Sequence, residues 1–212
     1  GIEGASIIVP TDTFLATALA VVHSGNRVIF ADSDPETLSL DIDDVERSIT
    51  PDTKAVILVH IGGIISPQWR RLQQLCEDRR LYLIEDCAHA HGCSIDGKAA
   101  GTLGVAGAFS FFPTKVLTTG EGGVIVTNDE EIYRKSNMIR NQGKNPDMGN
   151  RISELGHNFR MSEMTALVGV QQMRKAEAVL DQRRHIAECY DHLLANVEGV
   201  RPVKPFGPSG YY

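Results

Sequence analysis

The stretch Leu81-Tyr-Leu-Ile-Glu-Asp-Cys-Ala-His-Ala-His-Gly92 decides how this chain is expected to fold. Its first four residues form an apolar run, which is typical of a strand buried in a parallel sheet. Two acidic residues, Glu85 and Asp86, follow this run directly. The carboxyl ends of parallel strands form the edge of the sheet at which α/β proteins bind ligands. We therefore expect a carboxylate to point into a binding crevice at this position.

Strand and helix patterns alternate before this stretch. Strands are predicted at residues 6–9, 27–31, 54–60 and 81–85, with helices at 13–23, 42–48 and 66–79. Gly25 is expected to act as the C-cap of the first helix. Ser66 and Pro67 are expected to begin the third as its N-cap and a first-turn proline. Repeated strand–helix units of this length predict an α/β fold, with a mostly parallel sheet and helices on both faces.

The pattern changes after Gly92. Strands predicted at 106–112 and 122–127 are joined by a loop rather than a helix, so we expect the second to run antiparallel. A helix at 130–141, a polar irregular segment at 143–156 and a long helix from Met161 to about Leu194, breaking near Ala178, complete the pattern. The predicted division is a large domain at 1–160, a linking helix at 161–200 and the start of a small domain at 201–212.

Composition excludes several classes of protein. Charged residues at 23% and apolar residues at 42% describe an ordinary globular chain. A net charge of −6 provides no basic surface for nucleic acid. No apolar stretch reaches membrane-spanning length, and no signal peptide opens the chain. The four cysteines lack the paired spacing of a disulfide scaffold. We therefore expect a cytoplasmic protein that binds neither nucleic acid nor membranes.

A second informative stretch is Ser110-Phe-Phe-Pro-Thr-Lys115-Val-Leu-Thr-Thr-Gly120-Glu-Gly-Gly123, in which one lysine stands between an apolar run and a glycine-rich turn. A fixed carboxylate and a sequestered amine are what pyridoxal phosphate (PLP) needs, because the lysine forms a Schiff base and the acid partners the pyridinium nitrogen. The glycine run lacks the Lys-Ser/Thr ending of a phosphate-binding P-loop. Its glycines are expected to allow close approach beside Lys115.

These two stretches resemble those of the PLP-dependent nucleotide-sugar aminotransferases of the DegT/StrS type, a branch of the fold-type I aminotransferases. The resemblance runs through most of the chain, and the order and spacing of its segments are specific. It is carried by Val9–Phe14, Val59–Gly63, Glu85–Gly92, Ser110–Gly123 and Gly156–Glu163. It begins after the family's N-terminal segment and stops where the small C-terminal domain should begin, so we expect a truncated chain.

The resemblance implies a PLP-dependent transaminase working in two half-reactions. Glutamate or glutamine would donate nitrogen to the cofactor, which would then aminate a keto-sugar, with a nucleotide-linked sugar favoured. Lys115 would be the Schiff-base lysine and proton shuttle, and Asp86 the partner of the pyridinium nitrogen. The alternatives are a solvated loop lysine and a carboxylate that caps a helix or binds a metal. Some relatives carry His at the position of Lys115 and act as dehydratases, so Lys favours amino transfer.

Three further cofactor contacts are implied by the resemblance. His89 matches a position near the cofactor's phenolic oxygen, and Ser110 matches a serine that binds the cofactor phosphate. Phe14 matches an aromatic residue that stacks on the pyridine ring. The alternatives are a strand hydroxyl bonded to backbone for Ser110 and a core position on a helix for Phe14. His91 is interpreted as a packed histidine behind the site, and Glu85 as structural.

The resemblance also implies a homodimer with a shared active site. Asn158 matches an asparagine that reaches across the dimer interface to the partner's cofactor phosphate. The alternative for this segment is simple helix initiation, with Ser162 or a neighbour as the cap of the long helix. Beyond the transaminase, two functions stay open: a PLP-dependent sugar dehydratase, and a non-catalytic remnant or dimerisation module.

A metal site is the competing interpretation of the first stretch. Cys87, His89, His91 and Cys93 place four metal-ligand types at alternate positions, which an extended strand would present on one face. Four ligands in a row on one strand cannot close a tetrahedron, and zinc sites use wider pairings. We therefore expect no metal.

Overall fold

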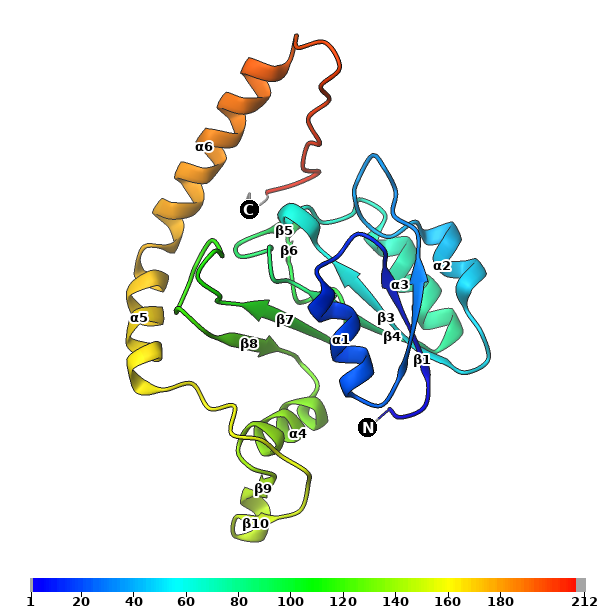
Figure 1. Ribbon diagram of the computed structural model, residues 1–212, viewed down its shortest axis with the longest axis vertical. Helices are drawn as coiled ribbons and strands as arrows, with labels where there is room; N and C mark the ends of the chain where they lie inside the picture. The colour runs from blue at the N-terminus through cyan, green and yellow to red at the C-terminus, as the bar shows by residue number, and fades with distance from the viewer. Residues whose placement is uncertain (1, 209–212) are drawn as a thin grey trace.

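The computed structural model describes residues 2–208, and residues 209–212 of the predicted third segment lie outside them. Its centre is a six-stranded sheet in the order β2-β1-β3-β4-β7-β8 (Figure 1). The strands are β1 Ser6–Pro10, β2 Arg27–Ala31, β3 Thr53–Val59, β4 Tyr82–Asp86, β7 Ala106–Ser110 and β8 Gly123–Val126. The pairs from β2 to β7 are parallel, and β8 runs antiparallel to β7. The predicted α/β class and its one antiparallel strand are confirmed.

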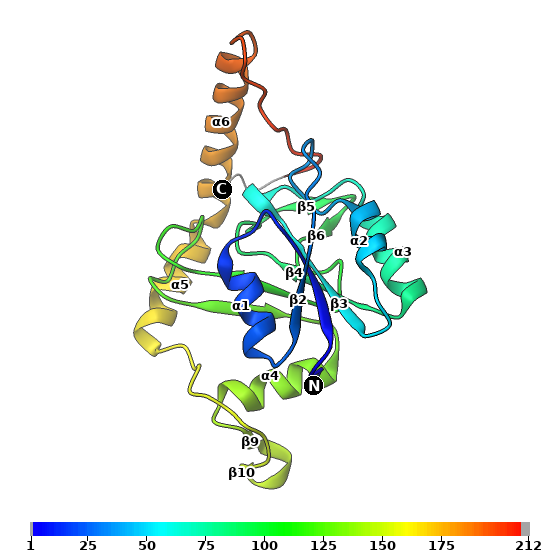
Figure 2. The same ribbon diagram turned by 45° about the vertical axis from the view of Figure 1, so that its right-hand side comes forward.

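Helices cover both faces of the sheet, as predicted (Figure 2). They are α1 Leu15–His23 on one face, and α2 Ile42–Ser48 and α3 Trp69–Arg79 on the other. Because side chains alternate across a strand, Ile8 packs with Val45 and Leu72 of α2 and α3, whereas Val9 packs with Val21 of α1. This burial on both faces explains why the inner strands read as near-continuous apolar runs.

The ends of two helices test the predicted caps. Gly25 adopts a left-handed φ of 75° directly after the C-cap residue of α1, which confirms its predicted role. The prediction of Ser66 as the N-cap of α3 is wrong, because α3 begins at Trp69 with Gln68 as its cap residue. Ser66 instead forms a turn before the helix, in which its Oγ accepts a hydrogen bond from the Gln68 N–H at 3.2 Å.

Two small hairpins lie outside the central sheet. Strands β5 Ser94–Ile95 and β6 Lys98–Ala99 form one, and β9 Lys144–Asn145 and β10 Arg151–Ile152 form the other. The second hairpin encloses the 3₁₀ turn η2 Pro146–Met148. For residues 143–156, predicted to be polar and irregular, the structure adds this short hairpin and leaves residues 153–156 without a helix or strand. Two-residue strands are too short to show the alternation from which a strand is predicted.

After β8, the last strand of the central sheet, the chain is mostly helical. Helix α4 Glu130–Arg140 is followed, after the second hairpin, by α5 Glu163–Arg174 and α6 Ala176–Leu194. The predicted long helix is thus two helices that part at Lys175 rather than near Ala178. Ser162 caps α5 as predicted, accepting from the Thr165 N–H at 3.1 Å. Across residues 2–208, every helix is too short or too polar to cross a membrane.

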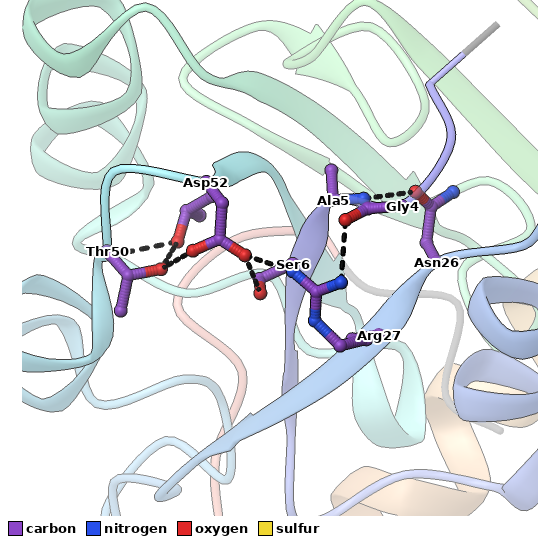
Figure 3. A network of polar contacts seen from close by, with 8 residues as sticks. Gly4, Ala5, Ser6, Asn26, Arg27, Thr50 and Asp52 are labelled. Carbon is purple, nitrogen blue, oxygen red and sulfur yellow. Dashed lines mark hydrogen bonds and ion pairs between the residues drawn. The ribbon is translucent and has the colours of Figure 1, made fainter.

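The amino-terminal edge of the sheet is held by a polar network that centres on Asp52 (Figure 3). Its carboxylate accepts from Ser6 Oγ at 2.8 Å and from Thr50 Oγ1 at 2.5 Å, and it pairs with Arg27. The Thr50, Ser6 and Arg27 donors hold the pKa of Asp52 well below its usual value. This network joins β1, β2 and the start of β3 at the edge opposite the candidate site.

Candidate active site

A cavity of about 660 Å³ opens at the carboxyl edge of the parallel strands. Its walls come from the segments that follow β1, β3, β4 and β7, together with the turn before β8. The lining residues are Asp12, Thr13, Phe14, Ala16, Val59, His60, Ile61, Asp86, Ala88, His89, Ser110, Phe112, Thr114, Lys115, Glu121 and Gly122. The position agrees with the crevice expected from the end of β4, because parallel strands deliver their loops to one edge.

Five of the six predicted site residues line this one cavity. Phe14 follows β1. Asp86 ends β4 and His89 follows it, while Ser110 ends β7 and Lys115 follows it. These residues are far apart in the sequence, and the parallel topology brings them together. The cavity supports the predicted grouping, while the chemical role of each residue stays a prediction.

Asp86 is held from two sides. Thr17 Oγ1 in α1 donates to its Oδ2 at 2.7 Å, and the Ala88 N–H donates to its Oδ1 at 3.1 Å. Thr17 itself lies 2.7 Å from the hydroxyl of Thr13, which lines the cavity. These contacts fix the carboxylate in one orientation, and each oxygen keeps acceptor capacity for a further donor.

Lys115 lies in the loop after β7 and is half-buried. Its backbone N–H donates to the Phe112 carbonyl at 3.0 Å, and the next two residues, Val116 and Leu117, are buried. This apolar anchor holds the loop down while the lysine lines the cavity. The simple alternative of a fully solvated loop lysine does not describe this position.

His89 is a neutral imidazole in this setting. Burial lowers its pKa, the positive charge of Lys115 lowers it further, and Asp86 opposes the shift. The Gly62 N–H donates to its Nδ1 at 3.2 Å, so the ring proton of the neutral form lies on Nε2. His89 can therefore act as a hydrogen-bond donor in the cavity.

Phe14 and Ser110 are the remaining two of the five predicted residues that line the cavity. Phe14 is 77% exposed and is the cap residue before α1, so the alternative of a core phenylalanine on a helix is wrong. An aromatic ring left uncovered in a cavity wall is suited to stacking on a planar ligand. The Ser110 Oγ accepts from the Phe112 N–H at 3.3 Å, which leaves the hydroxyl proton available to an acceptor.

Asn158 lies apart from the other five residues. It is exposed, does not line the cavity, and forms an isolated bridge with Asn141 beside α4. Arg160 donates to the Asn141 side chain at 2.8 Å in the same region. A single copy of this chain therefore does not bring Asn158 to its own cavity.

The segment 87–93 forms turns rather than the extended strand that the metal interpretation assumed. Cys87 and Cys93 are buried in an apolar cluster with Trp69, and His91 packs edge-on against Phe111 at a centroid distance of 5.0 Å. The predicted position of His91 behind the site agrees with this burial. The two cysteines thus lie in an apolar cluster, His91 packs against an aromatic ring and His89 lines the cavity, so the four residues are not arranged as a set of metal ligands.

Within residues 2–208, one group has metal-ligand spacing, namely His60, Glu85 and Cys87. Burial raises the pKa of the Cys87 thiol, and the charge of Glu85 raises it further, so the thiol stays protonated. A protonated thiol is a poor metal ligand. The Glu85 carboxylate is already occupied by four donors. This group is better described as a buried hydrogen-bond network.

The sequence of this chain matches the model of the DegT/DnrJ/EryC1/StrS aminotransferase family over residues 1–206, so the chain belongs to this family. It is 38% identical to the GDP-perosamine synthase of Escherichia coli O157:H7, over 89% of this chain and 51% of that protein. The dTDP-4-dehydro-2,3,6-trideoxy-D-glucose 4-aminotransferase of Saccharopolyspora spinosa is 37% identical, with 98% and 57% covered.

Solved structures agree with this assignment. DesI, determined in the presence of its TDP-sugar product, superposes with a TM-score of 0.90 at 35% identity, over 100% of this chain and 53% of that one. The E. coli GDP-4-keto-6-deoxy-D-mannose-3-dehydratase with bound hydrated PLP has a TM-score of 0.91 at 29% identity, with 99% and 58% covered. The chain spans about half the length of the curated relatives it matches.

Proposed function

We propose that this chain carries the cofactor site of a PLP-dependent aminotransferase that moves an amino group from glutamate or glutamine to a keto-sugar, with a nucleotide-linked sugar favoured. The observation that carries the proposal is the single cavity that combines the Lys115 amine, the fixed Asp86 carboxylate and the exposed ring of Phe14. Relatives that aminate nucleotide-linked sugars support the substrate class.

The residues present fit PLP. The cavity has the volume of an ordinary small-molecule site. Among its lining residues, the ring of Phe14, the carboxylate of Asp86, the amine of Lys115 and the hydroxyl of Ser110 suit the ring, the ring nitrogen, the aldehyde and the phosphate of the cofactor. When bound, PLP supplies an aldehyde that accepts amines and a ring that withdraws electrons.

Each side chain has a task that follows from its own chemistry. Asp86 holds a proton on the ring nitrogen, because a nearby carboxylate favours the charged form. Lys115 provides the amine and, once free, moves protons as a general acid and base. The His89 Nε2–H orients the ring through a hydrogen bond, and the Ser110 hydroxyl donates to the phosphate. Phe14 orients the ring by stacking on it.

The shared active site of a homodimer belongs to the same proposal. Asn158 is exposed and remote from its own cavity, which is compatible with a role in the cavity of the partner subunit. We further propose a cytoplasmic enzyme whose residues 1–160 form the large domain, with 161–200 linking it to a small domain that starts at 201.

The alternative of a dehydratase is not favoured by the sugar aminotransferases among the relatives, although GDP-4-keto-6-deoxymannose-3-dehydratases are among the structural neighbours. Lys115 occupies the position at which a dehydratase would be expected to carry His. The remaining alternative, a non-catalytic remnant or dimerisation module, predicts that no cofactor is bound at all.

The proposal is tested by adding PLP to the full-length natural form of the protein and recording the visible spectrum before and after borohydride. We expect a yellow band that borohydride abolishes, and a pyridoxyl adduct on Lys115 by peptide mass spectrometry. Lys115→Ala should lose both, whereas Lys98→Ala, which alters an exposed lysine of the β5–β6 hairpin, should keep them.

Two outcomes would decide against the proposal. If the parent protein shows neither band nor adduct, the cofactor assignment fails and the remnant alternative gains support. If the adduct forms but glutamate and glutamine are not consumed when a keto-sugar is supplied, amino transfer fails and elimination is favoured. Transfer leaves the nitrogen of the donor on the sugar product, whereas elimination does not.

A further inference from the structure

Glu85 and Asp86 are adjacent residues that face opposite sides of the sheet, because side chains alternate along β4. Asp86 faces α1 and the cavity. Glu85 faces the other way, and its side chain, like that of His60, is fully buried. A buried charge is costly unless it is fully paired, so its surroundings indicate what it is for.

Four donors converge on the Glu85 carboxylate. Its Oε1 accepts from the N–H groups of Leu103 at 2.7 Å and Gly104 at 2.8 Å. Its Oε2 accepts from the Gly101 N–H at 2.7 Å and lies 2.9 Å from His60 Nε2. Burial alone would raise the pKa of Glu85, but the His60 ring and the amides of Gly104 and Gly101 lower it below its usual value. The group is therefore a carboxylate, and His60 Nε2 carries the shared proton.

The loop 101–104 is shaped for this contact. Gly101 has a left-handed φ of +86°. A Cβ at Gly104 would lie 2.2 Å from the Leu83 carbonyl oxygen, so only glycine allows the loop this close to β4. An apolar side chain at position 85 would leave three buried N–H groups without an acceptor, which costs more than an average hydrogen bond contributes.

The same pair is joined to the backbone of Asp86. The His60 N–H donates to the Asp86 carbonyl at 3.1 Å, while the His60 ring bonds Glu85. On the other side of β4, the Cys87 N–H donates to the Ala108 carbonyl at 2.8 Å. His60 also lines the cavity. The ends of β3 and β4 and the loop 101–104 thus meet at one carboxylate directly behind Asp86.

We propose that Glu85 and His60 are positioning residues, which hold the end of β4 so that the Asp86 carboxylate stays aligned with the ring nitrogen of the cofactor. This inference rests on the proposed function. It assigns neither residue a contact with substrate or cofactor. Glu85 acts through the backbone and through His60.

Replacement of Glu85 by glutamine is the sharpest perturbation. A glutamine amide keeps the size of the side chain but turns one oxygen into an NH₂ group, which only donates. Either orientation of that amide sets the NH₂ group against at least one of the three loop N–H donors. We expect the loop and the end of β4 to shift, and the Asp86 carboxylate to move with them.

The test uses PLP labelled with ¹⁵N at the ring nitrogen, whose chemical shift reports whether this nitrogen is protonated. In the parent protein we expect the nitrogen to stay protonated up to alkaline pH. In Glu85→Gln, the pH at which it loses its proton should fall by about one unit, a tenfold change of the size that supporting partners carry around metal ligands. Amide exchange at residues 101, 103 and 104 should rise in the cofactor-free protein.

Leu72→Ala is the matched control. Leu72 is buried on the same face of the sheet, in the core with α2 and the strands, and it is neither one of the four partners of the Glu85 carboxylate nor a residue of the cavity lining. Its truncation should lower stability without moving the titration of the ring nitrogen. If Leu72→Ala moves it as far as Glu85→Gln does, general destabilisation explains the effect and the inference is overturned.

His60 provides a second route should Glu85→Gln fail to fold. His60→Gln retains an amide donor for Glu85, whereas His60→Leu removes it. We expect the leucine variant to shift the ring-nitrogen titration and the glutamine variant to restore most of it. Equal behaviour of the two variants, or no shift in either, overturns the inference.

Failure of the proposed function is distinguishable from failure of this inference. A parent protein that binds no PLP overturns the proposed function, and the positioning role falls with it before any variant is compared. A parent protein that binds PLP with a protonated ring nitrogen, together with an unchanged Glu85→Gln, overturns the positioning role alone.

Discussion

The central sheet and the helix α5 differ in how their apolar side chains are covered. Leu58 of β3 is fully buried between α2 and α3 and the neighbouring strands. Helix α5 buries none of its residues, and Leu167 is 58% exposed. Met164 and Met173 are exposed on the same helix. The sheet builds its own core and carries the cavity, whereas α5 presents an apolar surface of the kind that marks an interaction site.

The same substitution made in both regions has the largest expected effect and tests this contrast directly. Leu58→Ala should lower the free energy of unfolding by about 4 kcal/mol, because a fully buried leucine leaves a cavity that the rigid sheet cannot close. Leu167→Ala should change it by less than about 0.5 kcal/mol in dilute protein. Urea denaturation monitored by circular dichroism measures both.

Concentration sharpens the comparison. If α5 is covered by a second copy, Leu167→Ala should become more destabilising as the protein concentration rises, since association stabilises the folded state by mass action. A large effect of Leu167→Ala at every concentration would contradict the contrast, because it would mean that α5 is buried within one chain.

Glycines against the central sheet and outside it provide the next test. Gly104→Ala should destabilise by about 3 kcal/mol, because its Cβ would overlap the Leu83 carbonyl oxygen, which is backbone and cannot rotate away. Gly149, in the loop of the β9–β10 hairpin, has a φ of +64°, and no atom lies within 4 Å of the position that a Cβ would take there. Gly149→Ala should therefore cost only about 1 kcal/mol of conformational strain. Thermal unfolding of the two variants gives the ranking, and equal costs would contradict it.

The lowered pKa of the buried His91 makes the stability of the sheet region depend on pH. Burial is the main cause that lowers the pKa of His91 to about 4, and the positive charges of Lys115 and His89 lower it further. The backbone of Ser110 acts in the opposite direction and raises it. Because the unfolded histidine binds a proton near pH 6.5, stability falls as pH drops from about 6.5 toward 4. The loss attributable to this one group between pH 7.5 and pH 5 is about 2 kcal/mol.

The measurement is the free energy of unfolding at pH 7.5 and pH 5 for the parent protein and for His91→Leu. The variant should show a weaker loss on acidification, by about the amount assigned to His91. His89, whose pKa is also lowered, remains in both proteins and cancels in the difference. An unchanged pH dependence in His91→Leu would show that His91 is accessible to protons without unfolding.

Much of the fold could be predicted from the sequence, and the reasons are physical. The run 54–60 is rich in apolar and β-branched residues, and this composition predicts a strand that is buried on both faces. The helix at 42–48 was predicted with the bounds that the structure has. The β5–β6 hairpin was missed although Asp96-Gly97, a strong hairpin signal, marks its turn. The break at Lys175 has no such marker, since neither glycine nor proline interrupts the helical pattern there.

The site divides in the same way. Asp86 and Lys115 could be grouped because one ends a strand and the other follows one, and parallel strands end at one edge. Phe14 was grouped with them through the family resemblance. Asn158 follows no strand of the central sheet, and its predicted role depends on a second copy that no single sequence describes. The network at Glu85 could not be predicted, because three of its four partners are backbone N–H groups of a loop, which side-chain patterns do not mark.

The smallest expected effect concerns the hydroxyl that holds Asp86. Thr17 is buried and donates to Asp86 Oδ2 at 2.7 Å, so Thr17→Val removes this donor, together with the contact to the Thr13 hydroxyl, while keeping the shape of the side chain. We expect PLP to bind about fivefold more weakly, which corresponds to about 1 kcal/mol, the contribution of one hydrogen bond. Absorbance titration with PLP measures the dissociation constant.

The control lies at the other end of the same helix. Ser24 Oγ donates to the Val21 carbonyl at 2.8 Å and accepts from Asn26 Nδ2 at 2.9 Å, so Ser24→Ala also removes hydroxyl hydrogen bonds at α1 without touching the cavity. It should leave PLP affinity unchanged, and Thr17→Ser, which keeps the donor, should stay close to the parent. If Thr17→Ser weakens binding as much as Thr17→Val, packing of the methyl group rather than the hydrogen bond positions Asp86. The orientation of Asp86 in the cavity would then depend on the shape of the side chain at position 17 and not on its hydroxyl.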